Sequence, residues 1–177
     1  PVRLSFYSLP GAAAGNTLYP NTINQIEFYG NTLDRSLTLG AGDVKVYYQV
    51  GGTATVATGV KLTVSPGVIW KFAGGRLDVN GALDAVGTAA QKVVVTSYPD
   101  DSQGGDANGD GYSVGQPGDW ARIYFSDSVV DFLTRLEHVI IRYGGSSNEG
   151  SLYLNGSNIS VLSSEIAYSS THGVRID

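Results

Sequence analysis

Short stretches of alternating apolar and polar residues recur along the chain and predict β-strands. Clear examples are Lys61–Val64, Arg76–Val79, Arg122–Phe125 and Ser151–Leu154, in which every second side chain is apolar. One face of such a strand can pack into a core. No stretch longer than about eight residues keeps the 3.6-residue period of an amphipathic helix. The pattern therefore predicts an all-β fold.

These strands belong to a repeat. Arg76–Gly81 and Ser151–Gly156 share one form, and Arg122–Ser126 and Gly173–Asp177 align with them. We place the starts of this strand near residues 53, 76, 122, 151 and 173, which gives spacings of 23, 46, 29 and 22 residues. A spacing of about 22 residues suits one three-strand coil of a parallel β-helix. The long spacing is one coil plus an insertion, which we assign to residues 99–120.

Stacking the coils in this register predicts the orientation of the side chains. Two rows are expected to point into the core: Leu77, Ile123, Leu152 and Val174, and beside them Val79, Phe125, Leu154 and Ile176. The row between them is expected to point outward: Asp78, Tyr124, Tyr153 and Arg175. Gly74–Gly75 and Gly144–Gly145 fall at matching corners, where a positive φ is needed. Because neighbouring strands lie about 4.8 Å apart, like residues of successive coils should touch.

The repeat divides the chain into two parts. We assign residues 51–177 to a right-handed parallel β-helix of about four coils, and residues 1–50 to a β-rich N-terminal cap or the end of a preceding module. The chain begins at Pro1, and Val174–Asp177 starts a coil that nothing follows. We therefore expect a segment of a longer protein with further modules. The alternative is an end that stacks on another copy, a heterologous contact that builds a filament.

Several segments carry a family resemblance, among them Gly59–Val68, Gly75–Leu83, Pro117–Trp120 and Arg142–Gly145. With the Asp-rich insertion between them, they resemble the right-handed parallel β-helix repeat modules of large bacterial secreted and cell-surface, adhesin-like proteins. The resemblance implies the architecture and an extracellular or cell-surface location. It implies no particular activity, because this fold hosts many functions.

Composition narrows the function classes. Eleven Lys and Arg against sixteen Asp and Glu give a net charge of −5, which argues against a nucleic-acid partner. No apolar run approaches roughly 18 residues, so no membrane span is expected. The chain has no Cys, which excludes thiolate metal sites and thiol catalysis and fits a bacterial exterior.

The strongest chemical signal is Asp106–Gly111, which reads D-A-N-G-D-G and matches the first half of a calcium loop. Asp106, Asn108 and Asp110 would direct alternate side-chain oxygens at one Ca²⁺ ion, a hard cation that prefers oxygen ligands. The twelfth loop position is Pro117 instead of a bidentate Glu, so this is not an EF-hand. Further carboxylates would come from Asp119 and from Asp101 or Asp100. The competing interpretation is a solvated turn, because Asp, Asn and Gly are turn residues.

The outward pair Tyr124 and Tyr153 is a second candidate. Exposed aromatic rings flanked by polar groups can lie against sugar rings, so a contact with glycans is one interpretation. The other is that stacked tyrosines stabilise a flat sheet face.

Catalytic signatures are weak. The sequence has neither a G-x-S-x-G elbow nor an H-E-x-x-H motif. A lyase-like protein that acts on polysaccharides would need calcium and an Arg or Lys base, and Lys71 and Arg142 fall in one outward column. The other interpretation of these two residues is that they are solubility charges. We therefore expect a non-catalytic, calcium-stabilised extracellular module with a structural or adhesive role, and keep the lyase-like protein as the alternative.

Overall fold

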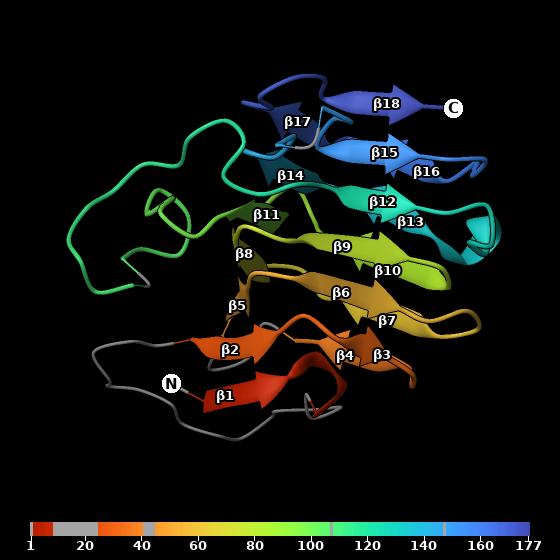
Figure 1. Ribbon diagram of the computed structural model, residues 1–177, viewed down its shortest axis with the longest axis horizontal. Coiled ribbons are helices and arrows are strands. Elements are labelled where there is room, and N and C mark those ends of the chain that lie inside the picture. Colours follow the sequence, from red (N-terminus) through yellow and green to blue (C-terminus); the bar gives the residue numbers. More distant parts are fainter. Residues whose placement is uncertain (1, 9–24, 41–44, 107, 147) are drawn as a thin grey trace.

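The computed structural model describes residues 2–8, 25–40, 45–106, 108–146 and 148–177 of the chain. In these ranges the chain forms eighteen β-strands and two short 3₁₀ helices, η1 (Phe6–Ser8) and η2 (Asp131–Leu133). Every strand pairing is parallel, and the chain visits three sheets in turn as it winds upward (Figure 1). The fold is therefore the expected all-β parallel β-helix.

The three sheets are named A, B and C here. Sheet A has seven strands in the order β1 (Val2–Ser5), β2 (Ile26–Tyr29), β5 (Val46–Val50), β8 (Ile69–Ala73), β11 (Val93–Ser97), β14 (Val139–Arg142) and β17 (Glu165–Ala167). Sheet B has six: β3 (Thr32–Leu33), β6 (Thr53–Val56), β9 (Arg76–Val79), β12 (Ile123–Phe125), β15 (Leu152–Leu154) and β18 (Val174–Ile176). Sheet C has five: β4 (Leu37–Leu39), β7 (Lys61–Val64), β10 (Ala82–Val86), β13 (Arg135–Glu137) and β16 (Ser160–Leu162).

The helix has about six coils, whereas the sequence predicts about four. The additional coils come from the strands within residues 26–50, which pair in register with the later coils. Leu37 is aligned with Leu62 of β7, and Tyr47 with Trp70 of β8. The stack therefore begins well before residue 53, and the count was wrong because these early coils depart from the repeat form seen later.

The predicted inward rows are correct. Leu77, Ile123 and Leu152 are aligned across β9, β12 and β15, and each is at most 1% exposed. Burying an aliphatic side chain of this size contributes about 1.5–3 kcal/mol. The last members of the two rows, Val174 and Ile176, are 41% and 69% exposed because no further coil covers them. The core therefore runs through the stack and thins out at β18.

The glycine corners are confirmed in three of four positions. Gly74, Gly75 and Gly145 have φ values of 68°, 71° and 93°. At the second corner Tyr143 takes the other left-handed position, with φ of 64°. Gly144 is required for a different reason: an added Cβ would lie 2.7 Å from the Ser151 hydroxyl and 3.1 Å from the Trp120 ring.

Sheet A also carries an apolar row on its outer face. Val46, Ile69, Val94 and Ile140 follow one another across β5, β8, β11 and β14, and all are buried. A Cβ at Gly104, in the insertion, would lie 3.1 Å from the Val46 side chain. The insertion therefore folds back over the outer face of this sheet.

Candidate functional site

The insertion at residues 99–120 is the main departure from the repeat. It leaves sheet A after β11 and rejoins the stack at β12 in sheet B, and Figure 1 shows it as the long loop at the left. Trp120 anchors its far end: the ring is fully buried, stacks on Phe72 at 4.8 Å between ring centroids, and donates a hydrogen bond of 2.7 Å from Nε1 to the Arg142 carbonyl. Trp120 is therefore a packing residue that fixes the end of the insertion to the core.

Lys71 lies beneath this insertion. It points outward from β8 as the alternation predicts, yet its side chain is 0% exposed. Its Nζ donates hydrogen bonds to the carbonyl oxygens of Asp100, at 2.9 Å, and Gly105, at 3.0 Å. Oδ1 of Asp101 lies 3.7 Å away. The ammonium group thus holds three points of the insertion against sheet A.

The electrostatics of Lys71 reflect this burial. Loss of hydration lowers the pKa of its ammonium group, while the negative charges of Asp101 and Asp100 act in the opposite direction. The Asp100 carboxylate is itself used within the insertion, where it accepts hydrogen bonds of 2.5 Å from the hydroxyls of Thr96 and Ser102. Asp100 is therefore a structural residue, and its carboxylate is already satisfied.

Three carboxylates converge beside Lys71. One oxygen from each of Asp101, Asp106 and Asp110 lies within 4.8 Å of the others. Two of them were predicted from the D-x-N-x-D-G pattern, and Asp101 was predicted as a completing carboxylate. Asn108 belongs to the same loop and donates a 2.9 Å hydrogen bond to Oδ2 of Asp110. The structure therefore brings together three of the predicted ligands, Asp101, Asp106 and Asp110, with Asn108 hydrogen-bonded to Asp110 beside them.

Backbone amides shape the loop around Asp106. Its carboxylate accepts hydrogen bonds from the N–H groups of Gly109, at 2.6 Å, and Gly111, at 3.0 Å. These hydrogen bonds, that from Gly111 first, lower the pKa of the Asp106 carboxyl group. Asp106 is consequently held as a carboxylate, the form in which it can ligate a cation.

Asp101 is the member of the cluster that is drawn into the protein. Its Oδ2 accepts hydrogen bonds from the backbone N–H and the hydroxyl of Ser113, at 2.7 and 3.0 Å. Its Oδ1 is buried and accepts no hydrogen bond in the described part of the chain. The Lys71 ammonium lies 3.7 Å from this oxygen, so it compensates the charge as an ion pair but donates no hydrogen bond to it. Three carboxylates with one such oxygen fit a hard divalent cation such as Ca²⁺.

Asp119 lies apart from this cluster. Its Oδ2 accepts a 2.7 Å hydrogen bond from the backbone N–H of Gln116, which closes a local turn just before Trp120. Sequence distance alone does not separate it from Asp101, because both flank the Asp106–Gly111 loop. The burial of Lys71 could not be predicted from the sequence either. The alternation of side chains places Lys71 on the outer face of sheet A, and only the folded structure shows that the insertion covers it.

The outward row of sheet B is aligned as predicted. Tyr124 faces Asp78 on one side and Tyr153 on the other, and the two rings meet edge to face at 5.2 Å. The Arg175 guanidinium lies 4.7 Å from the Tyr153 ring centroid, and the Tyr153 hydroxyl donates to Asp177 at 2.9 Å. These contacts account for the row as a stabilising ladder.

The residues of the lyase-like alternative are engaged elsewhere. Lys71 is buried under the insertion. Arg142 shares its outward column but makes an ion pair with Glu165 at 2.7 Å and lies 5.9 Å from the Tyr168 ring centroid. Neither side chain stands free at the outer face of sheet A.

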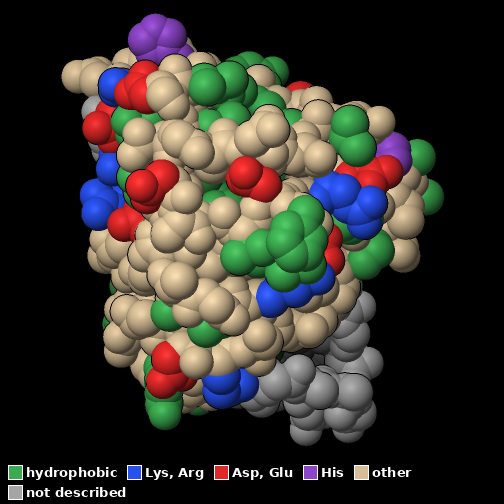
Figure 2. All heavy atoms as spheres, turned by 90° about the vertical axis from the view of Figure 1, so that its right-hand side faces the viewer, with side chains coloured by type: hydrophobic (Ala, Val, Ile, Leu, Met, Phe, Trp, Pro, Cys, Tyr) green, Lys and Arg blue, Asp and Glu red, His purple; other side chains and the backbone are tan. Residues whose placement is uncertain are grey.

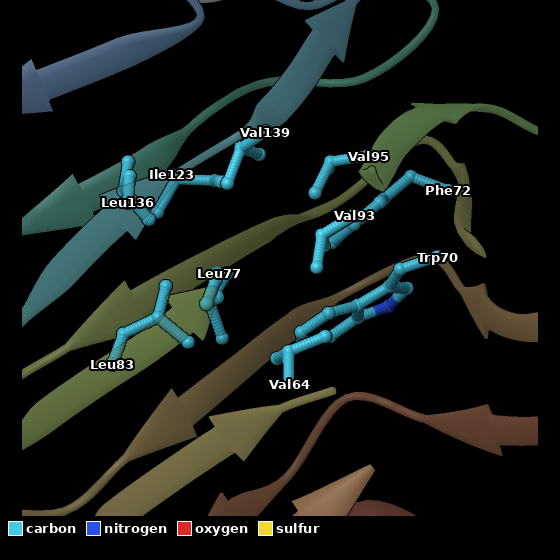
Figure 3. A pocket seen from close by; sticks show the side chains of 11 residues that line it. Val64, Trp70, Phe72, Leu77, Leu83, Val93, Val95, Ile123, Leu136 and Val139 are labelled. Atoms are coloured by element: carbon cyan, nitrogen blue, oxygen red, sulfur yellow. The ribbon is translucent and has the colours of Figure 1, made fainter. Parts of the chain in front are cut away.

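A small apolar cavity lies inside the helix, between the three sheets. Figure 3 shows this space, lined from all three sheets by apolar side chains such as Trp70, Leu83 and Ile123. It measures about 10 Å³, which is barely the volume a water molecule needs. This cavity among the described residues is therefore too small to hold an organic ligand.

One outer face carries an exposed aromatic ring. Phe132 in η2 is 88% exposed and Leu133 beside it is 39% exposed. Figure 2 views the side of the molecule on which η2 lies, and one of the hydrophobic patches visible there is raised near the middle of this face. A patch of this small extent is ordinary for a protein surface.

No family model matches the chain, and neither a curated protein nor a solved structure shows significant similarity to it. Among the described residues there is no helix of the length and apolar character that crossing a membrane would require.

Proposed function

We propose that the chain is a non-catalytic, extracellular structural or adhesive module of a bacterial secreted or cell-surface protein, in which Ca²⁺ orders the insertion. The observation that carries the proposal is the cluster of Asp101, Asp106 and Asp110 on a solid parallel β-helix. Such a helix is a rigid rod with outer faces and ends available for contact. The Cys-free composition and the resemblance to adhesin-like modules support an extracellular setting.

The role of the cation would be structural. The buried ammonium of Lys71 already holds the base of the insertion, but Asp106 and Asp110 lie exposed beyond its hydrogen bonds. Three close carboxylates repel one another without a counter-ion. One Ca²⁺ ion would join the exposed tip of the insertion to Asp101 and thereby to sheet A.

The open end of the helix supports assembly as the second part of the proposal. Leu162, Val174 and Ile176 are 50%, 41% and 69% exposed in the last coil. Among the strands that the structure describes, β16, β17 and β18 each lie at the end of a sheet with one neighbour. Stacking of another copy, or of further modules, on this end would cover the apolar side chains and pair the free strand edges.

Thermal unfolding in CaCl₂ and in excess EGTA tests the proposal, with light scattering on the same samples. A site filled at about 100 times its dissociation constant adds about 2.7 kcal/mol of stability. We expect the melting temperature to fall in EGTA and to recover when Ca²⁺ is restored. An identical melting temperature in both buffers would reject the calcium site. Particles that grow with protein concentration would support end-to-end assembly, and monomers at every concentration would reject self-stacking.

A further inference from the structure

A groove on the outer face of sheet A is lined by two lysines that make no ion pair within the described part of the chain. Eight of the eleven Lys and Arg side chains make ion pairs with Asp or Glu. Lys45 and Lys92 are exposed and make no ion pair with any described residue. Both line the same groove of about 440 Å³. The net charge of the chain is −5, so the positive charge of these two ammonium groups is opposite in sign to that of the protein as a whole.

The walls of the groove complement these charges. No carboxylate is among the described residues that line it. Its floor is formed by Ile69, Val94 and Ile140, three members of the apolar row on the outer face of sheet A. A volume of this size lies within the range of about 300–1,000 Å³ that is typical of ligand pockets. The groove therefore offers an apolar surface flanked by positive charge.

Two carboxamides complete the lining. Gln91 comes from the turn between β10 and β11, and Gln103 from the insertion. Neither side-chain amide makes a hydrogen bond within the described residues. A carboxamide both donates and accepts hydrogen bonds, so it suits hydroxyl groups.

The two lysines are close enough to share one anion. Lys45 precedes β5 and Lys92 precedes β11, and these strands are neighbours of β8 on its two sides, so the two backbones are separated by about 10 Å. Flexible lysine side chains can reach a common anion across that distance.

The occupant is constrained by the strands beneath it. The floor lies on β8, β11 and β14, and each of these strands is paired on both sides. No free strand edge is present there for a peptide to join by backbone hydrogen bonds. A ring with one apolar face, several hydroxyls and an anionic group matches the floor, the carboxamides and the ammonium groups together.

We propose that this groove binds an anionic sugar unit, with its carboxylate or sulfate between Lys45 and Lys92 and one face of its ring on Ile69, Val94 and Ile140. The inference names a ligand class for the adhesive role and in that respect rests on the proposed function. It does not require the calcium site, because both lysines and the apolar floor lie outside the insertion, which contributes only Gln103 to the proposed contacts.

Isothermal titration calorimetry in CaCl₂ tests this proposal with defined probes. A hyaluronan oligosaccharide supplies carboxylates, a carrageenan oligosaccharide supplies sulfates alone, and carboxyl-reduced hyaluronan is the neutral match. We expect one of the charged probes to bind and the neutral probe to bind at least about tenfold more weakly, since two exposed ion pairs are lost. Which charged probe binds identifies the anionic group. Binding should also weaken as NaCl is raised.

Matched variants locate the interaction. Lys45→Ala/Lys92→Ala should lower the affinity about tenfold, by the same loss of two exposed ion pairs. Lys61→Ala/Arg135→Ala removes the same net charge from sheet C and should leave the affinity unchanged. All four side chains reach solvent, so the melting temperatures should change little. Equal losses in both double variants would overturn the proposal.

Two other outcomes would also overturn it: no heat with either charged oligosaccharide, or tighter binding of a polyglutamate peptide, which would indicate a protein partner. The melting and scattering experiments on ligand-free protein are separate from these titrations. A flat titration beside an intact calcium response therefore rejects the groove alone.

Discussion

The Lys71 ammonium group lies 3.7 Å from Oδ1 of Asp101, and both side chains are withdrawn from solvent. The same Asp101 carboxyl group approaches Asp106 and Asp110 in the exposed part of the insertion. The Asp101 carboxylate thus lies between the Lys71 ammonium group and the proposed Ca²⁺ site. The contribution of this arrangement to stability can be tested by replacing Lys71 and, separately, by replacing the proposed Ca²⁺ ligands.

Replacing Lys71 with Met should destabilise the protein strongly. The substitution keeps the length of the side chain but leaves the Asp100 and Gly105 carbonyls without their donor and the Asp101 charge uncompensated. Removing one partner of a buried ion pair typically costs about 3–5 kcal/mol. Urea unfolding should show this loss, while Lys92→Met at an exposed position should stay within about 0.5 kcal/mol. Equal stability of the two variants would show that the Lys71 contacts contribute nothing net.

The carboxylates of the insertion should differ in their response to Ca²⁺. Asp106→Asn should lose most of the calcium-dependent rise in melting temperature, because it removes a charged ligand from the cluster. Asp119→Asn should keep the rise, since Asp119 lies in a separate turn and an Asn oxygen can still accept from Gln116. A stabilisation of about 2.7 kcal/mol corresponds to roughly 5–10 °C in a protein of this size. A full calcium response in Asp106→Asn would contradict the site.

Inward side chains at equivalent positions of different coils should contribute unequally to the free energy of unfolding. Ile123→Ala creates a cavity in a covered coil and should cost about 2–5 kcal/mol. Ile176→Ala removes a side chain that is 69% exposed and should cost less than about 0.5 kcal/mol. Denaturant unfolding of the isolated monomer measures both. A large loss in Ile176→Ala would mean that the last coil is covered in solution.

Alkaline pH should weaken the fold through Tyr48. Burial, then the neighbouring Tyr98 and Glu27, raise the pKa of Tyr48 from its usual 10.0 to about 12. Above pH 10 the unfolded chain releases this proton while the folded chain retains it, so stability falls as pH rises through this interval. Tyr48→Phe should flatten this decline by an amount on the order of 1–2 kcal/mol.

The matched control for this prediction is Tyr112→Phe, because the Tyr112 ring is 79% exposed. Urea unfolding at a series of pH values measures the slope for each variant. Lys71 works in the opposite direction and mainly at lower pH, because burial lowers its pKa and stability therefore rises with pH below its ordinary value of 10.5, where the unfolded chain binds the proton more tightly. An unchanged slope in Tyr48→Phe would contradict the assignment.

Alternation of side chains made much of the fold readable from the sequence. Ile123, Tyr124 and Phe125 point in, out and in because a strand allows no other sequence of orientations. Their partners in β9 and β15 follow from repeated sequence forms. The early coils were harder to find because β3 spans only two residues and the sequences of these coils depart from the form repeated later.

The burial of residues on the outer face could not be predicted from the alternation of side chains. The alternation places Lys71 and Tyr48 on the outer face of sheet A, where solvent would be expected. Both are covered in the folded chain, and Tyr48 stacks on Tyr98 at 3.7 Å between ring centroids. Tyr98 directly follows β11, at the corner from which the insertion leaves the stack. A contact between residues fifty positions apart is visible only in the three-dimensional structure, and the same holds for the groove beside it.

The corner after Ser97 has a consequence for how such a scaffold can vary. The chain leaves β11, travels through the insertion and returns to β12, yet both strands stay in register with the coils above and below them. The geometry of the rod is thus decoupled from the length and chemistry of what is displayed at this corner. Natural variation or engineering could therefore replace the insertion with a different binding loop while the β-helix beneath it keeps its structure.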